Sequence, residues 1–366
     1  MFTSASRRSW ALRSVKSLFQ RSRARRGKSQ TSSIEHLEDR ALLATFTVTN
    51  TNGDASDGSL GAAIAAANAA NGADDIVFNV PLAGAPILLD AELTIDDELT
   101  INGTNTITGE RMVVSGQDAN RVFFIDGTDV IDVNINNLVM IDGLAPTDES
   151  GGAVFIDQNA TVVMDNVEVS SSSARDGGGI ATQLSNLTLR NSLISLNSAT
   201  RDGGGLFTNF GTINVIDSEV SNNSATNDGG GIHASSTFLT QRSTVSNNTA
   251  GEDGGGALFD GTAASSASVF WGNTAGDDGG GVDNRLFFEA NNTTFSTNNA
   301  TDVGGGIRNA GVMTLTNSTL SQNSANTRGG GVFTSLVPAT QTLMFNTLIA
   351  GTVSYTHLTL PTKRIV

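Results

Sequence analysis

The chain contains no cysteine, so it can form no disulfide, no thiolate metal site and no cysteine nucleophile. Proline is scarce, with 5 residues among 366, and only 5% of the residues are aromatic. So little proline excludes a collagen-like triple helix, although 41 residues are glycine. No run of about 18 apolar residues occurs, and the sequence therefore predicts no transmembrane helix.

Basic residues are few outside the N-terminal arm. Residues 1–40 hold ten Lys or Arg and three Asp or Glu, a net charge of +7, whereas residues 41–366 hold 11 and 33, a net charge of −22. An acidic body argues against nucleic acid as a partner of residues 41–366. A basic arm at the start of a chain predicts a targeting segment, and by charge alone it also suits a nucleic-acid or membrane-surface tail.

One phrase returns every 25 or 26 residues. Gly-Gly-Gly triplets begin at positions 177, 203, 229, 254, 279, 304 and 329, and an imperfect copy begins at Gly151. An apolar or small residue follows each copy. A fixed period of this length is typical of a solenoid, in which each repeat buries its apolar face against its neighbours.

Three further columns appear when the copies are aligned. The apolar column is Val169, Ile194, Val220, Val245, Phe270, Phe295, Leu320 and Ile349. The asparagine column is Asn197, Asn223, Asn248, Asn273, Asn298 and Asn323. The alanine column is Ala174, Ala199, Ala225, Ala250, Ala275, Ala300 and Ala325.

Within a repeat, apolar residues alternate with a period of 2, which indicates strands. We therefore predict an all-β fold, a right-handed parallel β-helix with about three strands per coil. The apolar columns should fill the interior, and glycine should supply positive φ or close approach at a corner. Stacked asparagines should hydrogen-bond along the axis. A flexible linker would not keep such columns in register.

Residues 45–80 carry, in order, the sequence signals of a strand, a turn, a helix and a second strand. Ser59 can cap the N-terminus of an alanine-rich helix, and Asn71-Gly72 can end it. Such a helix would cover the open end of the solenoid. We assign residues 45–110 to an N-terminal cap and the first coils, and 111–352 to the β-helix, with regular repeats from 151.

The segment Leu37–Ala44, LEDRALLA, resembles the LEPR-x-LL signature of large exported proteins from planctomycete-type bacteria, with Asp39 at the usual proline position. The resemblance implies that residues 1–44 are an export segment that is removed from, or disordered in, the mature protein. It also implies an extracellular or cell-surface location.

The block from Phe46 to Phe78 resembles the opening of bacterial surface proteins with pectin-lyase-like β-helices, although Gly61-Ala62 replace an Arg-Gln pair of that pattern. The later phrases GGGI and S-x-N-S-A resemble the repeats of chlamydial-type polymorphic outer-membrane proteins. Both resemblances imply a surface β-helix protein. Residues 353–366 depart from the repeat and resemble translated sequencing-adapter read-through, so we expect a non-native tail.

An acidic column precedes the triplets, formed by Asp176, Asp202, Asp228, Asp253 and Asp278 and widened by Glu252 and Asp277. One interpretation is a calcium ladder, because carboxylate oxygens at coil spacing suit Ca²⁺. The other is that Asp favours turns before Gly and that the charges are solvated. We favour the second, since no Asp-x-Asp-x-Asp-Gly loop accompanies the column. No other metal or cofactor is predicted.

Three functions suit this fold. The first is an exported surface or matrix protein that makes structural or adhesin-like contacts with surface glycans or other surface proteins, without catalysis. The second is a polysaccharide lyase or glycosidase, but a catalytic cleft usually interrupts the repeats with long loops and aromatic platforms. The third is a Ca²⁺-dependent rod. Without an evident His or Ser partner in its coil, His233 is expected to pack in the wall or lie at the surface.

Overall fold

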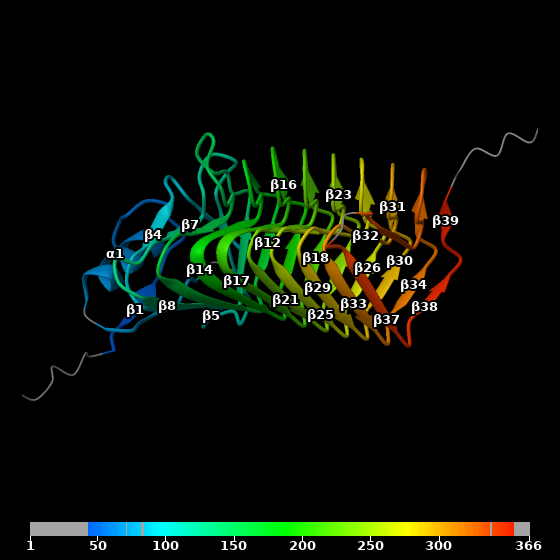
Figure 1. Ribbon diagram of the computed structural model, residues 1–366. Coiled ribbons are helices and arrows are strands. Elements are labelled where there is room, and N and C mark those ends of the chain that lie inside the picture. Colours follow the sequence, from blue (N-terminus) through cyan, green and yellow to red (C-terminus); the bar gives the residue numbers. More distant parts are fainter. Residues whose placement is uncertain (1–42, 71, 82–83, 337–338, 355–366) are drawn as a thin grey trace, which may run out of the picture. The chain divides into compact units, whose positions relative to one another are not determined.

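The computed structural model describes residues 43–354 except 71, 82–83 and 337–338. These residues belong to one compact unit, Ala41–Val366. The predicted export segment lies outside the described residues except for its last two positions, and so does the tail from Tyr355 onward. Within the unit, the strands stack in chain order along one axis (Figure 1).

Three parallel sheets form the faces of the solenoid. The first sheet contains β1 (Thr45–Val48), β2 (Asp74–Phe78), β4 (Leu93–Ile95), β5 (Leu99–Asn105), β7 (Phe123–Ile125), β8 (Ile131–Asn136), β10 (Val154–Ile156), β11 (Ala160–Asp165), β14 (Ile180–Arg190), β17 (Leu206–Ile216), β20 (Ile232–Ala234), β21 (Thr237–Gln241), β24 (Ala257–Phe259), β25 (Thr262–Ser266), β28 (Val282–Asn284), β29 (Phe287–Asn291), β32 (Ile307–Asn309), β33 (Val312–Thr316), β36 (Val332–Thr334) and β37 (Gln341–Phe345).

The second sheet contains β3 (Ile87–Leu88), β6 (Met112–Ser115), β9 (Leu138–Ile141), β12 (Glu168–Ser170), β15 (Leu193–Ser195), β18 (Glu219–Ser221), β22 (Thr244–Ser246), β26 (Val269–Trp271), β30 (Thr294–Ser296), β34 (Thr319–Ser321) and β38 (Leu348–Ala350). The third contains β13 (Ser173–Ala174), β16 (Ser198–Ala199), β19 (Ser224–Ala225), β23 (Thr249–Ala250), β27 (Thr274–Ala275), β31 (Asn299–Ala300), β35 (Ser324–Ala325) and β39 (Val353–Ser354).

The coils pair in parallel and in register, as the repeat predicts. Ile194 pairs with Val220, and Phe270 pairs with Phe295 one coil apart. The prediction of about three strands per coil needs one refinement. The first face of most coils consists of two short strands, such as β20 and β21, which join into a single long strand only in β14 and β17.

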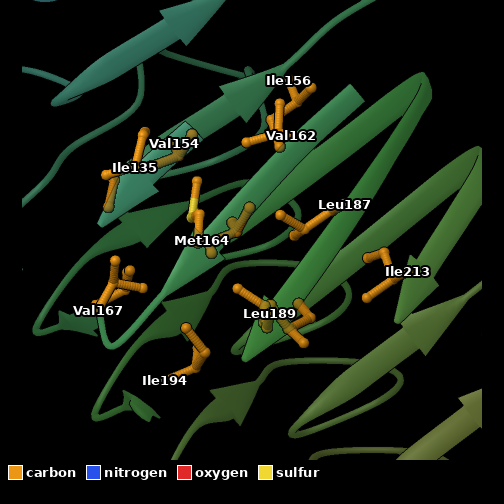
Figure 2. Close-up of a cluster of buried hydrophobic side chains, with 14 of the residues drawn as sticks. Ile135, Val154, Ile156, Val162, Met164, Val167, Leu187, Leu189, Ile194 and Ile213 are labelled. Carbon is orange, nitrogen blue, oxygen red and sulfur yellow. The ribbon is translucent and has the colours of Figure 1, made fainter. Parts of the chain in front are cut away.

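The core consists of stacked apolar columns. The six central members of the predicted column, Ile194, Val220, Val245, Phe270, Phe295 and Leu320, are all fully buried. Figure 2 shows the neighbouring interior side chains, among them Val162, Leu187 and Ile213, pointing between the faces. Full burial of such a side chain stabilises the fold by roughly 1.5–3 kcal/mol. The columns therefore supply the main stabilisation of the solenoid.

The asparagine column forms an interior ladder that stabilises one corner. The Oδ1 atom of Asn248 accepts hydrogen bonds from the backbone N–H and the Nδ2 of Asn223, at 2.9 and 3.0 Å. Its own Nδ2 donates to the carbonyl oxygen of Val220 at 3.0 Å. The same bonds recur along the column, so each buried amide is satisfied by the adjacent coils.

The glycine triplets are required by this ladder and by the turn. Gly229 has a φ of +65°, which a residue with a side chain rarely adopts. A Cβ at Gly231 would lie 2.7 Å from the carbonyl oxygen of Gly256 and 2.8 Å from the amide of Asn248. Both predicted roles of glycine, positive φ and close approach, are therefore confirmed in one triplet.

The two ends of the described solenoid differ. The helix α1 (Leu60–Ala69) contacts β1, β2 and β4, and the Ser59 hydroxyl caps it by accepting from the N–H of Ala62 at 3.1 Å. The helix ends at Ala69, two residues before the predicted Asn71-Gly72 signal, and Ala70 is its C-cap. At the other end Ile349 pairs with Leu320 but is 42% exposed. Among the described residues, no helix is long and apolar enough to cross a membrane.

Candidate functional site

The acidic column lies in the turn that precedes each glycine triplet. The carboxylate of Asp176 is fully buried, and the side chains of Asp202, Asp228, Asp253 and Asp278 are 15–16% exposed. Each Oδ1 accepts the backbone N–H of the equivalent residue in the next coil; the distances include 3.0 Å from Asp253 to Asp228 and 2.9 Å from Asp278 to Asp253. The carboxylates are therefore rungs of a ladder. Each one hydrogen-bonds to the backbone of the next coil, whereas a solvated turn residue would bond mainly to water.

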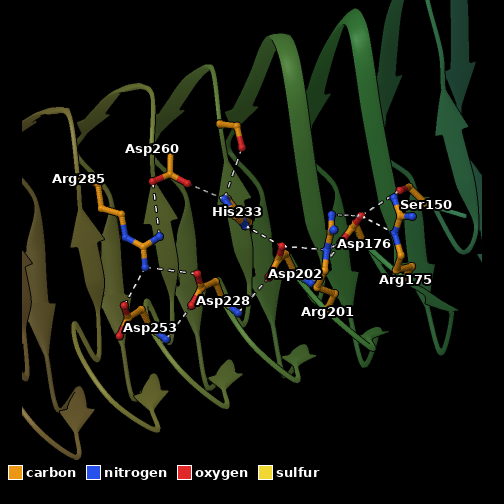
Figure 3. A network of polar contacts seen from close by, with 11 residues as sticks. Ser150, Arg175, Asp176, Arg201, Asp202, Asp228, His233, Asp253, Asp260 and Arg285 are labelled. Atoms are coloured by element: carbon orange, nitrogen blue, oxygen red, sulfur yellow. Dashed lines mark hydrogen bonds and ion pairs between the residues drawn. The ribbon is translucent and has the colours of Figure 1, made fainter. Parts of the chain in front are cut away.

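Arginines pair with the first members of the column. Nε and Nη2 of Arg201 each donate to a different oxygen of Asp176 at 2.7 Å, and Nε of Arg175 donates at 3.1 Å (Figure 3). Arg201 also lies 3.2 Å from Asp202. Arg175 precedes Asp176 in the sequence, and Arg201 precedes Asp202. Both arginines nevertheless pair with the buried carboxylate of Asp176, and this convergence could not be established from the sequence. Such a charged pair satisfies a group that would otherwise be costly to bury.

His233 lies between carboxylates from the two neighbouring coils. Its Nε2 is 3.1 Å from Oδ2 of Asp260, and its Nδ1 is 3.7 Å from Oδ2 of Asp202. The Ser235 hydroxyl, on the same face two residues later, is 3.5 Å from Nε2. Of the two expected placements, the structure shows the wall, where His233 is buried; the Ser neighbour in its own coil that the sequence analysis missed is Ser235, just after β20. The hydrogen bond from His233 lowers the pKa of Asp260, whereas burial raises the pKa of Asp202.

Arg285 is the centre of the second half of the network. It lies 2.7 Å from Asp253, 2.9 Å from Asp283, 3.3 Å from Asp228 and 3.6 Å from Asp260. Figure 3 shows its guanidinium reaching carboxylates of several coils. One cation therefore pairs with four carboxylates, of which Asp228 and Asp253 belong to the predicted column.

Asp283 is the most deeply buried acid of this half. It is fully buried in β28 and also pairs with Arg308 at 2.9 Å. Burial raises the pKa of Asp283 to about 6, and the two arginines oppose that rise. Neither Asp283 nor Arg285 was identified from the sequence, because each occurs at a column position where other coils carry unrelated residues.

The predicted calcium ligands do not converge as one set. Among the described residues, one group of three acids could share a cation: Asp277, Asp278 and Asp302, whose oxygens lie within 4.8 Å of one another. Asp278 belongs to the predicted column and Asp277 widens it, whereas Asp302 does not belong to it; Nε of Arg308 lies 3.3 Å from Asp278. Oxygen ligands of this kind suit Ca²⁺. Along the rest of the column, guanidinium groups occupy the places next to the carboxylates.

A second surface feature lies on the outer side of the first sheet. It is a hollow of about 410 Å³, which we call the outer trough. The residues that line it come from β17, β21, β25 and β29: Asn214, Ile216, Leu239, Thr240, Gln241, Ala264, Ser265, Ser266, Glu289 and Asn291. Ala264 pairs with Leu239 on one side and Glu289 on the other, so the small side chain between two large ones helps to form the hollow.

Comparison with known families gives a match to one segment of the chain, from just before β18 to just after β20. Residues 217–235 match the Chlamydia polymorphic membrane protein (Chlamydia_PMP) repeat. No curated protein matches the chain. The match is much shorter than the chain, and it agrees with the resemblance carried by the GGGI and S-x-N-S-A phrases.

The matched polymorphic membrane protein repeat has a defined place in the structure. It begins at Asp217, before β18, passes through Asn223 of the interior ladder and Asp228 of the acidic column, and ends at Ser235 beside His233. It therefore covers most of one coil and contains β18, β19 and β20. The chain is therefore a parallel β-helix repeat protein, and one of its segments is similar to the polymorphic membrane protein repeat.

Proposed function

We propose that the chain is an exported protein of the cell surface or extracellular matrix that makes adhesive or scaffolding contacts through its outer faces. Its partners are surface glycans or other surface proteins. The observation that carries the proposal is the polymorphic membrane protein repeat at residues 217–235, set in a solenoid whose coils keep register from Val154 to Thr334.

The outer faces suit such contacts because they repeat. Outward side chains of successive coils are about 4.8 Å apart, so a long partner meets the same spacing along the axis. The charged groups of the acidic column and of the residues around it, which we call the acidic flank, pair with one another: Asp176 with Arg201, and Asp253 and Asp283 with Arg285. These pairs support a structural role for that flank, which leaves the contact surface to the other faces.

The proposal is tested by adhesion of the purified full chain. Beads coated with the chain should bind to bacterial cells or their extracellular matrix more than beads coated with a β-helix of unrelated sequence. Pre-incubation with the free chain should abolish that difference. Equal binding by both kinds of bead would contradict an adhesive role.

One observation favours the alternative of a polysaccharide lyase or glycosidase. His233 lies between Asp202 and Asp260, and a histidine beside carboxylates is a common acid–base arrangement. We nevertheless expect no turnover when the chain is incubated with pectins, alginates and other acidic glycans. Product formation that Asp202→Ala abolishes, in a variant that keeps its circular dichroism spectrum, would establish the enzyme instead.

A further inference from the structure

We propose that the outer trough binds an uncharged polysaccharide chain that lies along the axis of the solenoid. The inference rests on the proposed function, since it names the class of glycan that one outer face recognises. The trough crosses four successive coils, from β17 to β29. A linear glycan laid across them would meet a new set of side chains at every coil, about 4.8 Å apart.

Two columns of the trough have complementary chemistry. The first places Leu239, which is 42% exposed, next to Ala264, and the C–H face of a sugar ring can pack on this apolar patch. The second runs in register through Ile216, Gln241, Ser266 and Asn291. Its amides and its hydroxyl can donate to and accept from sugar hydroxyl groups.

An aromatic side chain lies beside these columns. Phe287 begins β29, the strand that carries Glu289 and Asn291, and alternation places all three on the outer face. Its side chain is 39% exposed, although most large apolar residues of the described coils are buried. An exposed ring two residues along β29 from Glu289, which lines the hollow, suits stacking against a sugar.

Charge selects an uncharged glycan. No Lys or Arg lines the trough, and its one charged residue is Glu289. An acidic polysaccharide would bring like charge to this carboxylate and to a chain whose net charge is −15. Pectins and alginates are therefore disfavoured as ligands of this face.

The trough suits a glycan better than an extended peptide. Peptides that bind sheets usually add a strand to a free edge, where unpaired backbone groups supply the affinity. Here β21 pairs with β17 on one side and with β25 on the other, so no edge is free at the trough. A ligand must use side chains alone, which suits the hydroxyl-rich surface of a sugar chain.

The test measures binding of the full chain to immobilised neutral oligosaccharides, with hexasaccharides of glucose, mannose, galactose, xylose and N-acetylglucosamine as probes. Oligogalacturonate and an uncharged extended peptide serve as the competing ligand classes. We expect a neutral hexasaccharide to bind and Ala264→Trp to raise its Kd by about tenfold or more, by filling the hollow. Gln241→Ala should raise the Kd by several-fold.

Val163→Trp is the matched control. Val163 pairs with Thr188 in the same outward column as Ala264, outside the trough, so the same bulky change should leave the Kd unaltered. Binding of oligogalacturonate or peptide alone, equal effects of the two tryptophans, or no neutral ligand in the set would overturn the inference. A chain that adheres to cells but fails this test would leave the proposed function intact.

Discussion

Replacement of Arg285 by glutamine should destabilise the middle coils far more than loss of an exposed ion pair. Arg285 lies within 3.6 Å of four aspartates, and one of them, Asp283, is fully buried. Glutamine keeps much of the length of the side chain but removes the positive charge. The carboxylates would then face one another without their shared cation.

The magnitude follows from burial. Breaking a buried ion pair by removing one partner costs about 3–5 kcal/mol, because the remaining charge stays buried. We expect about 3 kcal/mol for Arg285→Gln, since Arg308 still lies 2.9 Å from Asp283. The matched control is Arg242→Gln. Arg242 pairs with Asp217 at 2.6 Å, but the two side chains are 50% and 42% exposed, so solvent screens the pair and its loss should change stability far less.

Native-state hydrogen exchange is the suitable assay, because a solenoid can open coil by coil and need not unfold in one step. Amides of β24, β28 and β32 should lose protection in Arg285→Gln, whereas amides around Arg242 should change little in its own variant. The double variant Arg285→Gln/Asp283→Asn should recover part of the loss, with a coupling of about 0.5–3 kcal/mol. Equal, small losses of protection in both single variants would refute the reasoning.

Three other predictions concern the interior and the acidic flank. Asn248→Ala should lower the opening free energy of the adjacent coils, measured by hydrogen exchange, by about 2 kcal/mol or more, because it removes buried hydrogen-bond partners of Asn223. A change below about 0.5 kcal/mol, on the order of a surface substitution, would contradict the ladder. The raised pKa of Asp283, about 6, means that the folded state holds its proton more tightly than the unfolded chain, so stability should fall as pH rises from about 4 to about 6. Asp283→Asn should flatten that part of the pH profile, and an unchanged slope would count against the burial. Millimolar CaCl₂ should raise the Tm no more than NaCl of equal ionic strength, whereas a saturable, chelator-reversible shift that is lost in Asp202→Asn/Asp228→Asn would show that the column binds calcium.

The fold was predictable because its determinants recur. Ile194 and Asn248 have counterparts 25 or 26 residues away, and a parallel solenoid places those counterparts in contact. Local signals sufficed for the cap, where Ser59 has the N-cap role that its position suggests. Periodicity therefore specified which residues are interior and which are at corners.

The polar network was only partly predictable because its members do not recur. Asp283 takes the column position that holds Leu258 in the preceding coil and Arg308 in the next. No recurring residue marks that position, and the contacts of Arg285 with Asp228 and Asp253 depend on side-chain direction. Stacking the sequence at the coil period does place Asp283 beside Arg308, and that signal was available.

The measurement that tests the central claim most directly is labelling of intact cells that produce the full chain. An antibody against the solenoid should label intact cells or their matrix, and external protease should remove that label while a cytoplasmic marker survives. A variant lacking residues 1–44 should be made in equal amount but remain inside the cell. Retention of the full chain in the cytoplasm, with label appearing only after the cells are opened, would contradict an exported surface protein.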